Sequence, residues 1–174
     1  MDLTPTNTQV PRNAEYRLTY RIGAVEDFGD PVVAMYRKAQ EVWGSAYAPY
    51  SGFYVAAVVL TRDGSMLAGT NQENASYPVG ICAERVVLSA LSCREGGGDV
   101  AAMLVLAGRK GEDPRRGEGV SDQPVAPCGM CRQALIEQIK RQKCDFPVFL
   151  AGMKGSCWHF EAASALLPFA FFEF

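Results

Sequence analysis

Three cysteines have the type and spacing needed to bind a metal ion. Cys82 stands at the start of one predicted helix, and Cys128 and Cys131 stand at the start of another, directly after Pro127. Free N–H groups and the positive dipole end at a helix start favour a thiolate, and residues three apart share one helix face. Three protein ligands leave the fourth tetrahedral position for water, which is the arrangement of catalytic zinc sites. The sequence therefore predicts one catalytic Zn²⁺ per subunit, held by these three cysteines.

Glu84 and Arg85 follow the first of these cysteines closely. Two residues turn a regular helix by about 200°, so Glu84 faces the metal only if Cys82 caps the helix and Glu84 lies in its first turn. There Glu84 is expected to carry protons from the bound water to a substrate. Three thiolates give the centre a net negative charge, so we expect Arg85 to donate hydrogen bonds to the ligand sulfurs. The alternatives are a Glu84 that only complements the helix dipole and an Arg85 that only solvates its helix or pairs with a surface acid.

The other cysteines and the single histidine favour structural roles. Cys93 lies late on an apolar helix pattern, Cys144 follows a helix end, and Cys157 begins a short predicted strand. Buried thiols often behave as small hydrophobic groups. His159 lies in the same alternating strand pattern, where a lone histidine is usually structural, so we expect none of these four residues to bind the metal.

Alternating strand and helix patterns must position these residues. The order of the patterns predicts an α/β fold, a three-layer α/β/α arrangement around a mixed five-stranded sheet. Residues 1–30 are interpreted as an N-terminal arm and residues 31–174 as one catalytic domain. A long surface loop rich in glycine, proline and charge is expected over 108–124. Strands are predicted at 53–60, 65–69, 100–107, 147–152 and 157–160, and helices at 31–43, 82–91 and 128–143.

Composition argues against a nucleic-acid or membrane partner. The formal net charge is -2, without the basic stripe that a phosphate backbone requires. No stretch approaches the roughly 20 apolar residues of a membrane span, and the N-terminus lacks the layout of a secretory signal. We therefore expect a cytoplasmic protein whose cysteines are reduced.

Two motifs resemble those of the small homotetrameric zinc-dependent cytidine deaminases. They are NQENASYPVGICAER at 71–85 and PCGMCRQ at 127–133, and the resemblance extends from about 46 to 167, including APYSGF at 48–53. It implies the cytidine deaminase fold and the hydrolysis of cytidine and deoxycytidine to uridine and deoxyuridine, with release of ammonia, in pyrimidine salvage. It also implies a homotetramer, or a dimer, with active sites near the subunit boundaries.

The resemblance further implies the residues that bind the nucleoside. Asn71 and Glu73 would bind the ribose hydroxyls, because an amide and a carboxylate together donate and accept hydrogen bonds. Phe53 would pack near the nucleoside, and the backbone near Ala83 would read the base. The alternative for Asn71 and Glu73 is turn chemistry after a strand.

Three other functions are compatible with parts of the pattern. A deaminase of a modified or antibiotic nucleoside, of the blasticidin S type, would keep the same chemistry. A nonenzymatic zinc domain would need a fourth protein ligand to close the site. A polynucleotide editor would need a basic groove with stacking aromatic residues, and the sequence shows neither. The aromatic C-terminal tail is expected to form an oligomer contact or to reach a neighbouring site.

Overall fold

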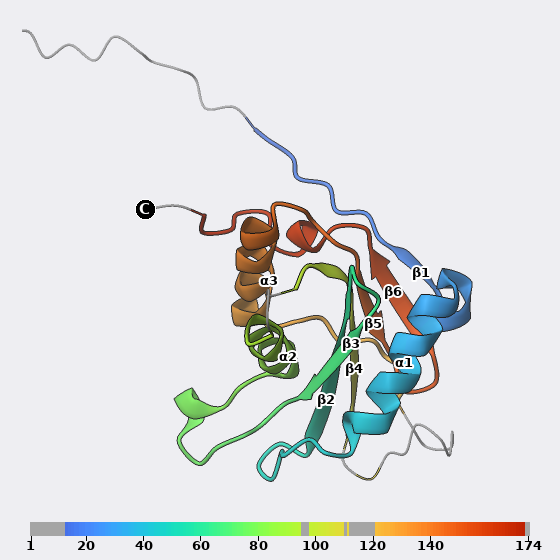
Figure 1. The fold of residues 1–174 in the computed structure, drawn as a ribbon, viewed down its shortest axis with the longest axis vertical. Helices are drawn as coiled ribbons and strands as arrows, with labels where there is room; N and C mark the ends of the chain where they lie inside the picture. Colours follow the sequence, from blue (N-terminus) through green and yellow to red (C-terminus); the bar gives the residue numbers. More distant parts are fainter. Residues whose placement is uncertain (1–12, 95–97, 110, 112–120, 173–174) are drawn as a thin grey trace, which may run out of the picture.

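A computed structural model describes residues 13–94, 98–109, 111 and 121–172 and contains one mixed sheet of six strands in the order β1-β6-β5-β4-β2-β3 (Figure 1). Only β4 and β5 run parallel to each other, and every other neighbouring pair is antiparallel. The strands are β1 Arg21–Ala24, β2 Phe53–Thr61, β3 Met66–Thr70, β4 Val100–Arg109, β5 Val148–Ala151 and β6 Ser156–Phe160.

Helices cover both faces of the sheet, which confirms the predicted three-layer α/β fold. Figure 1 shows α1 (Asp30–Trp43) on one side, and α2 (Ala83–Ser92) and α3 (Gly129–Gln142) on the other. Each face has its own buried core, because successive strand side chains point to opposite faces of the sheet and pack there against the helices of that layer. Short 3₁₀ turns lie at Val25–Phe28, Tyr77–Val79 and Ala163–Leu166.

The sheet has six strands rather than the predicted five. The additional strand, β1, lies within the segment interpreted as an N-terminal arm and pairs with the edge of β6. The sequence that leads into it alternates apolar and polar residues from Tyr16 to Ile22, the period-two pattern of an extended chain with two different faces. The backbone N–H of Val25 then donates to the carbonyl of Gly155, and Val25 is fully buried. The sheet therefore continues into the arm.

The parallel pair β4–β5 sets the position of α3. Parallel strands need a crossover connection, and α3 forms this connection over the face that α2 also covers. The predicted 108–124 loop, which precedes α3, falls largely on residues outside the described ranges, as do residues 1–12 of the arm. No helix within the described ranges is both long and apolar enough to span a lipid bilayer.

Candidate active site

The sulfur atoms of Cys82, Cys128 and Cys131 lie together at the starts of α2 and α3. All three Sγ atoms are within 4.8 Å of one another, with Cys82 and Cys128 3.9 Å apart and Cys128 and Cys131 3.6 Å apart. A zinc tetrahedron with Zn–S bonds of about 2.3 Å has S···S edges of about 3.8 Å. The donor set and its spacing therefore fit one zinc ion.

Helix capping brings these side chains into position. Cys82 and Cys128 are both extended N-cap residues, with ψ of 153° and 168°, and the helices begin at the following residues. Glu84 consequently lies in the first turn of α2, and Cys131 in the first turn of α3. This confirms the prediction that Cys82 caps its helix and that Glu84 follows in the first turn.

Arg132 is a residue to which the sequence pattern assigned no role. Its Nε donates to the carbonyl of Pro127 at 2.8 Å, and its Nη1 donates to the carbonyl of Leu166 at 3.0 Å. The side chain thus ties the loop before Cys128 to the 3₁₀ turn that follows β6. The sequence signals were its position next to Cys131 and its place in the PCGMCRQ motif.

The three thiols are electrostatically unequal. A hydrogen bond with Cys131 lowers the pKa of Cys82 to about 6, against the opposing effect of burial. The same hydrogen bond, together with burial, raises the pKa of Cys131 above its usual range. The two shifts favour the thiolate on Cys82 over the thiolate on Cys131. Binding a metal ion must release the remaining thiol protons, so the affinity rises with pH.

A cavity of about 270 Å³ opens beside the cluster and collects several of the predicted residues. Its volume is close to that of a typical small-molecule site. The walls come from β2, β4, the end of β3 and the loop before α3, and the lining residues are Phe53, Val55, Asn71, Cys82, Glu84, Val105, Ala107, Val125, Ala126 and Cys128. The structure thus brings Phe53, Asn71 and Glu84 together with two of the three cysteines.

Glu84 is the charged residue of this cavity. Only 4% of its surface is exposed, and burial raises the pKa of its carboxyl group above the usual range. A raised pKa favours the protonated form of a carboxyl group and brings its titration closer to neutral pH, which suits general acid–base catalysis. The position and burial of Glu84 suit proton transfer within the cavity.

Asn71 and Glu73 hold neighbouring backbone groups. Asn71 lines the cavity, where its Nδ2 donates to the carbonyl of Phe53 at 2.9 Å and its Oδ1 accepts from the N–H of Val55 at 2.8 Å. Glu73 lies outside the lining and accepts from the N–H groups of Tyr50 and Ser51 and from the Ser51 hydroxyl. The Ser51 hydroxyl is the main cause of its lowered pKa. Each side chain keeps spare hydrogen-bonding capacity, because amide and carboxylate oxygens accept more than one bond.

Arg85 and Ala83 lie beside the cavity rather than in its lining. Within the described residues, Arg85 makes no hydrogen bond to a cysteine sulfur, and its side chain lines a hollow between α2 and α3 with Glu137 and Arg141. Its charge contributes only slightly to the lowered pKa of Cys82. Ala83 is fully buried at the start of α2.

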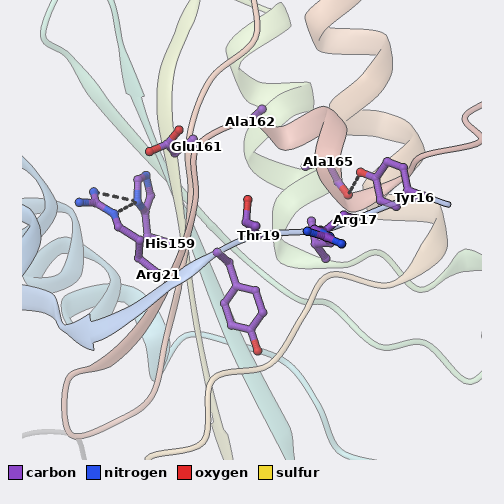
Figure 2. Close-up of a pocket in the computed structure, with 10 residues that line it drawn as sticks. Tyr16, Arg17, Thr19, Arg21, His159, Glu161, Ala162 and Ala165 are labelled. Atoms are coloured by element: carbon purple, nitrogen blue, oxygen red, sulfur yellow. Dashed lines mark hydrogen bonds between the residues drawn. The ribbon is translucent and has the colours of Figure 1, made fainter.

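A second cavity, of about 340 Å³, lies under the N-terminal arm and is separate from the cysteine cluster. Figure 2 shows Arg21 and His159 at this cavity, where Nε and Nη2 of Arg21 lie 3.1 and 3.0 Å from Nδ1 of His159. The His159 ring also stacks on Phe149 with a centroid distance of 4.5 Å, and burial lowers its pKa. His159 therefore joins β1 to the sheet.

Cys93, Cys144 and Cys157 lie outside the only metal-binding group found among the described residues.

Comparisons with known proteins agree with this geometry. The family model of the cytidine and deoxycytidylate deaminase zinc-binding region matches residues 32–144. A cytidine deaminase of Halalkalibacterium halodurans is 38% identical over 78% of this chain and 89% of its own length. One from Sporosarcina psychrophila is 36% identical over 82% of this chain and 90% of its own length. The crystal structure of a Burkholderia pseudomallei cytidine deaminase is 39% identical, with a TM-score of 0.63 over 80% of this chain and 98% of that one. The chain therefore belongs to the zinc-dependent cytidine deaminase family.

Proposed function

We propose that this protein hydrolyses cytidine and deoxycytidine to uridine and deoxyuridine and releases ammonia. The observation that carries the proposal is the buried carboxyl group of Glu84, which faces a small cavity beside three thiols with zinc-ligand spacing. Relatives that cover most of this chain are cytidine deaminases. The second candidate is a deaminase of a modified nucleoside, and its only support is that it would use the same zinc and glutamate chemistry.

Cys82, Cys128 and Cys131 are the proposed zinc ligands, and Glu84 is the proposed proton carrier. A zinc ion with three protein ligands keeps one position for water and lowers the pKa of that water. Glu84 would take one proton from the attacking water and deliver it to the ring nitrogen as the water oxygen bonds to the amine-bearing carbon. It would then take the second proton from the added hydroxyl and deliver it to the amine, which leaves as ammonia when the carbon–nitrogen bond breaks. Exclusion of bulk water from this carboxyl group, which is 4% exposed, supports such a transfer.

The proposed nucleoside contacts are Phe53, Asn71, Glu73 and the backbone near Ala83. Phe53 and Asn71 line the cavity, so both can contact a ligand there directly. Glu73 orders the loop that carries Tyr50 and Ser51, and we expect the ribose hydroxyls to compete for its carboxylate oxygens. The first-turn N–H groups of α2 are suited to a carbonyl oxygen of the base.

Arg85 is proposed to offset the charge of the three thiolates. Its side chain lies in the same first turn as Glu84, and its charge acts on Cys82 in the direction that favours the thiolate. The Coulomb attraction between a guanidinium and a thiolate falls off gradually with distance, so Arg85 can stabilise the thiolates without a direct hydrogen bond to them.

The assembly is proposed to be a homotetramer in the cytoplasm that serves pyrimidine salvage. Exposed aromatic side chains support a subunit contact, because soluble monomers seldom leave large apolar groups together at the surface. Tyr50 and Tyr77, whose ring centroids lie 6.1 Å apart, are 52% and 79% exposed, and the C-terminal Phe169, Phe171 and Phe172 are 89%, 60% and 53% exposed. In this proposal, residues 1–30 form an arm on a catalytic domain that spans 31–174.

A single substitution separates catalysis from metal binding. Glu84→Gln should keep one zinc per chain and the wild-type fold, while ammonia release from cytidine falls by about 10³-fold or more because a general acid–base group is lost. Glu41→Gln on the exposed face of α1, across the sheet from the cluster, is the matched control and should retain full activity. Activity of Glu84→Gln near the wild-type rate would contradict the assignment. Turnover rates on cytidine, deoxycytidine and blasticidin S distinguish the two candidate functions, a deaminase of simple nucleosides and a deaminase of a modified nucleoside.

A further inference from the structure

The carboxylate of Asp122 ties the loop before α3 to the turn between β5 and β6. Its Oδ1 accepts from the N–H groups of Lys154 at 2.8 Å and Ser156 at 3.1 Å, and its Oδ2 accepts from the Ser156 hydroxyl at 2.5 Å. The N–H of Met153 donates to the carbonyl of Ser121 at 3.2 Å. One carboxylate therefore organises an entire turn, and hydrogen bonds to an ionised acceptor are stronger than neutral ones.

The turn is a rigid platform for this anchor. The hydroxyl of Tyr36, a buried residue of α1, lies 3.1 Å from the carbonyl oxygen of Gly152 and 2.9 Å from that of Met153. A Cβ on Gly152 would overlap the backbone carbonyl of Asp122, so only glycine fits at this close approach. Asp122 is thus held against a surface that α1 fixes from the other side.

The chain that follows Asp122 forms part of the proposed active site. Val125 and Ala126 line the cavity beside the cysteine cluster. Pro124 and Pro127 are buried, and each restricts the backbone to a narrow range of φ. At the far end, Arg132 holds the Pro127 carbonyl. Four residues, 123–126, therefore lie between the anchors at Asp122 and Pro127, and a displacement of the first anchor is expected to move the cavity wall.

We propose that Asp122 is a positioning residue that sets the cavity wall formed by Val125 and Ala126 for the nucleoside. It touches neither the metal ligands nor the cavity, and it acts through the short tether to residues 125 and 126. The inference rests on the proposed function for the identity of the ligand. The mechanical part, namely that Asp122 orders 123–127, is testable without it.

Asp122→Ala removes all three hydrogen bonds of the carboxylate, whereas Asp122→Asn keeps the Oδ1 acceptor and can donate to the Ser156 hydroxyl. In Asp122→Ala we expect faster amide hydrogen exchange over 123–128 and a KM for cytidine raised about tenfold, because small misplacements of substrate-positioning groups are costly. The value of kcat should stay within about threefold and zinc content should be unchanged. Asp122→Asn should restore KM to within about twofold of wild type.

Asp63→Ala is the matched control. Asp63 also accepts hydrogen bonds from a side-chain hydroxyl, that of Thr61, and from a backbone N–H, that of Ser65. It lies beyond the far end of β2. The four residue steps along β2 from Ala57, which pairs with the cavity residue Val105, to Thr61 separate it from the cavity by about 14 Å. Asp63→Ala should reduce stability without raising KM.

Three results would overturn the proposal. They are unchanged exchange over 123–128 in Asp122→Ala, an unchanged KM despite faster exchange, and an equal rise of KM in Asp63→Ala. If Asp122→Ala does not fold, Ser156→Ala removes one bond of the anchor and should raise KM about threefold, and an unchanged KM there overturns the proposal. A wild-type protein that does not turn over cytidine contradicts the proposed function instead, and the exchange measurement still decides whether Asp122 orders the loop.

Discussion

Gly69 on β3 sets how closely α2 approaches the sheet, so Gly69→Ala should damage both stability and the site. The new Cβ would lie 2.9 Å from Cγ1 of Val86, 2.9 Å from the backbone nitrogen of Val87 and 3.1 Å from the carbonyl oxygen of Ala83. The Val86 side chain can rotate away. The two backbone atoms belong to the helix and cannot yield independently of it. The methyl group is therefore too close by a few tenths of an ångström, and α2 must move away from β3.

Overpacking of this kind costs about 1–3 kcal/mol, which lowers Tm by about 2–4 °C per kcal/mol in a chain of this size. Urea unfolding followed by circular dichroism at matched protein concentration measures this loss. Because α2 starts directly after Cys82 and carries Glu84, kcat/KM for cytidine should fall in the same variant. Gly44→Ala is the control, since its Cβ meets nothing within 4 Å and its backbone is already helical. A Gly69→Ala protein as stable as wild type would refute the argument that α2 and β3 are in limiting contact.

Three further substitutions test the cluster and the core. Cys131→Ser should reduce bound zinc from one per chain to near zero, measured by atomic absorption, while Cys93→Ser should keep the metal; zinc retained by Cys131→Ser would remove it from the ligand set. Burial raises the pKa of Cys157 from 9.0 to about 12, so the stability that this neutral thiol contributes is complete below pH 9 and is lost as pH rises toward 12, by at most about 1.4 kcal/mol per pH unit. Cys157→Ala should therefore flatten the decline in unfolding free energy between pH 9 and 11, and identical slopes would contradict this reasoning. Phe146→Ala should cost about 3–5 kcal/mol in urea unfolding because Phe146 is 1% exposed in the core under α2 and α3, and a loss below about 1 kcal/mol would mean that the core collapses around the gap.

Local capping made the metal cluster predictable from sequence. Cys82 and Cys128 each precede a run with helical periodicity, and the helices begin where the caps end. The convergence of the two helix starts is a tertiary property, which the pattern of strands and helices implies through the crossover to β5. Helix geometry gave the position of Glu84 in the first turn only as the condition for facing the metal, and the structure meets that condition because Cys82 is the N-cap.

Other features depend on contacts between distant segments and were not predictable in detail. The strand β1 exists because Arg21–Ala24 finds the free edge of β6, more than 130 residues away. The Asn71 amide completes the backbone hydrogen bonds of β2, and Glu73 orders the loop at Tyr50 and Ser51. A sequence motif indicates which side chains lie near a ligand. It does not reveal which backbone N–H and C=O groups already form hydrogen bonds with those side chains. The contacts of Asp122 with Lys154 and Ser156 are hidden for the same reason.

The central claim is tested most directly by following the ultraviolet absorbance of cytidine with the zinc-loaded protein, after removal of the metal with a chelator, and after zinc is restored. The account predicts conversion of cytidine to uridine by the zinc-loaded protein, loss of turnover on chelation and recovery when zinc is added back. No turnover by folded, zinc-loaded protein, or undiminished turnover by protein verified to be free of metal, would contradict it.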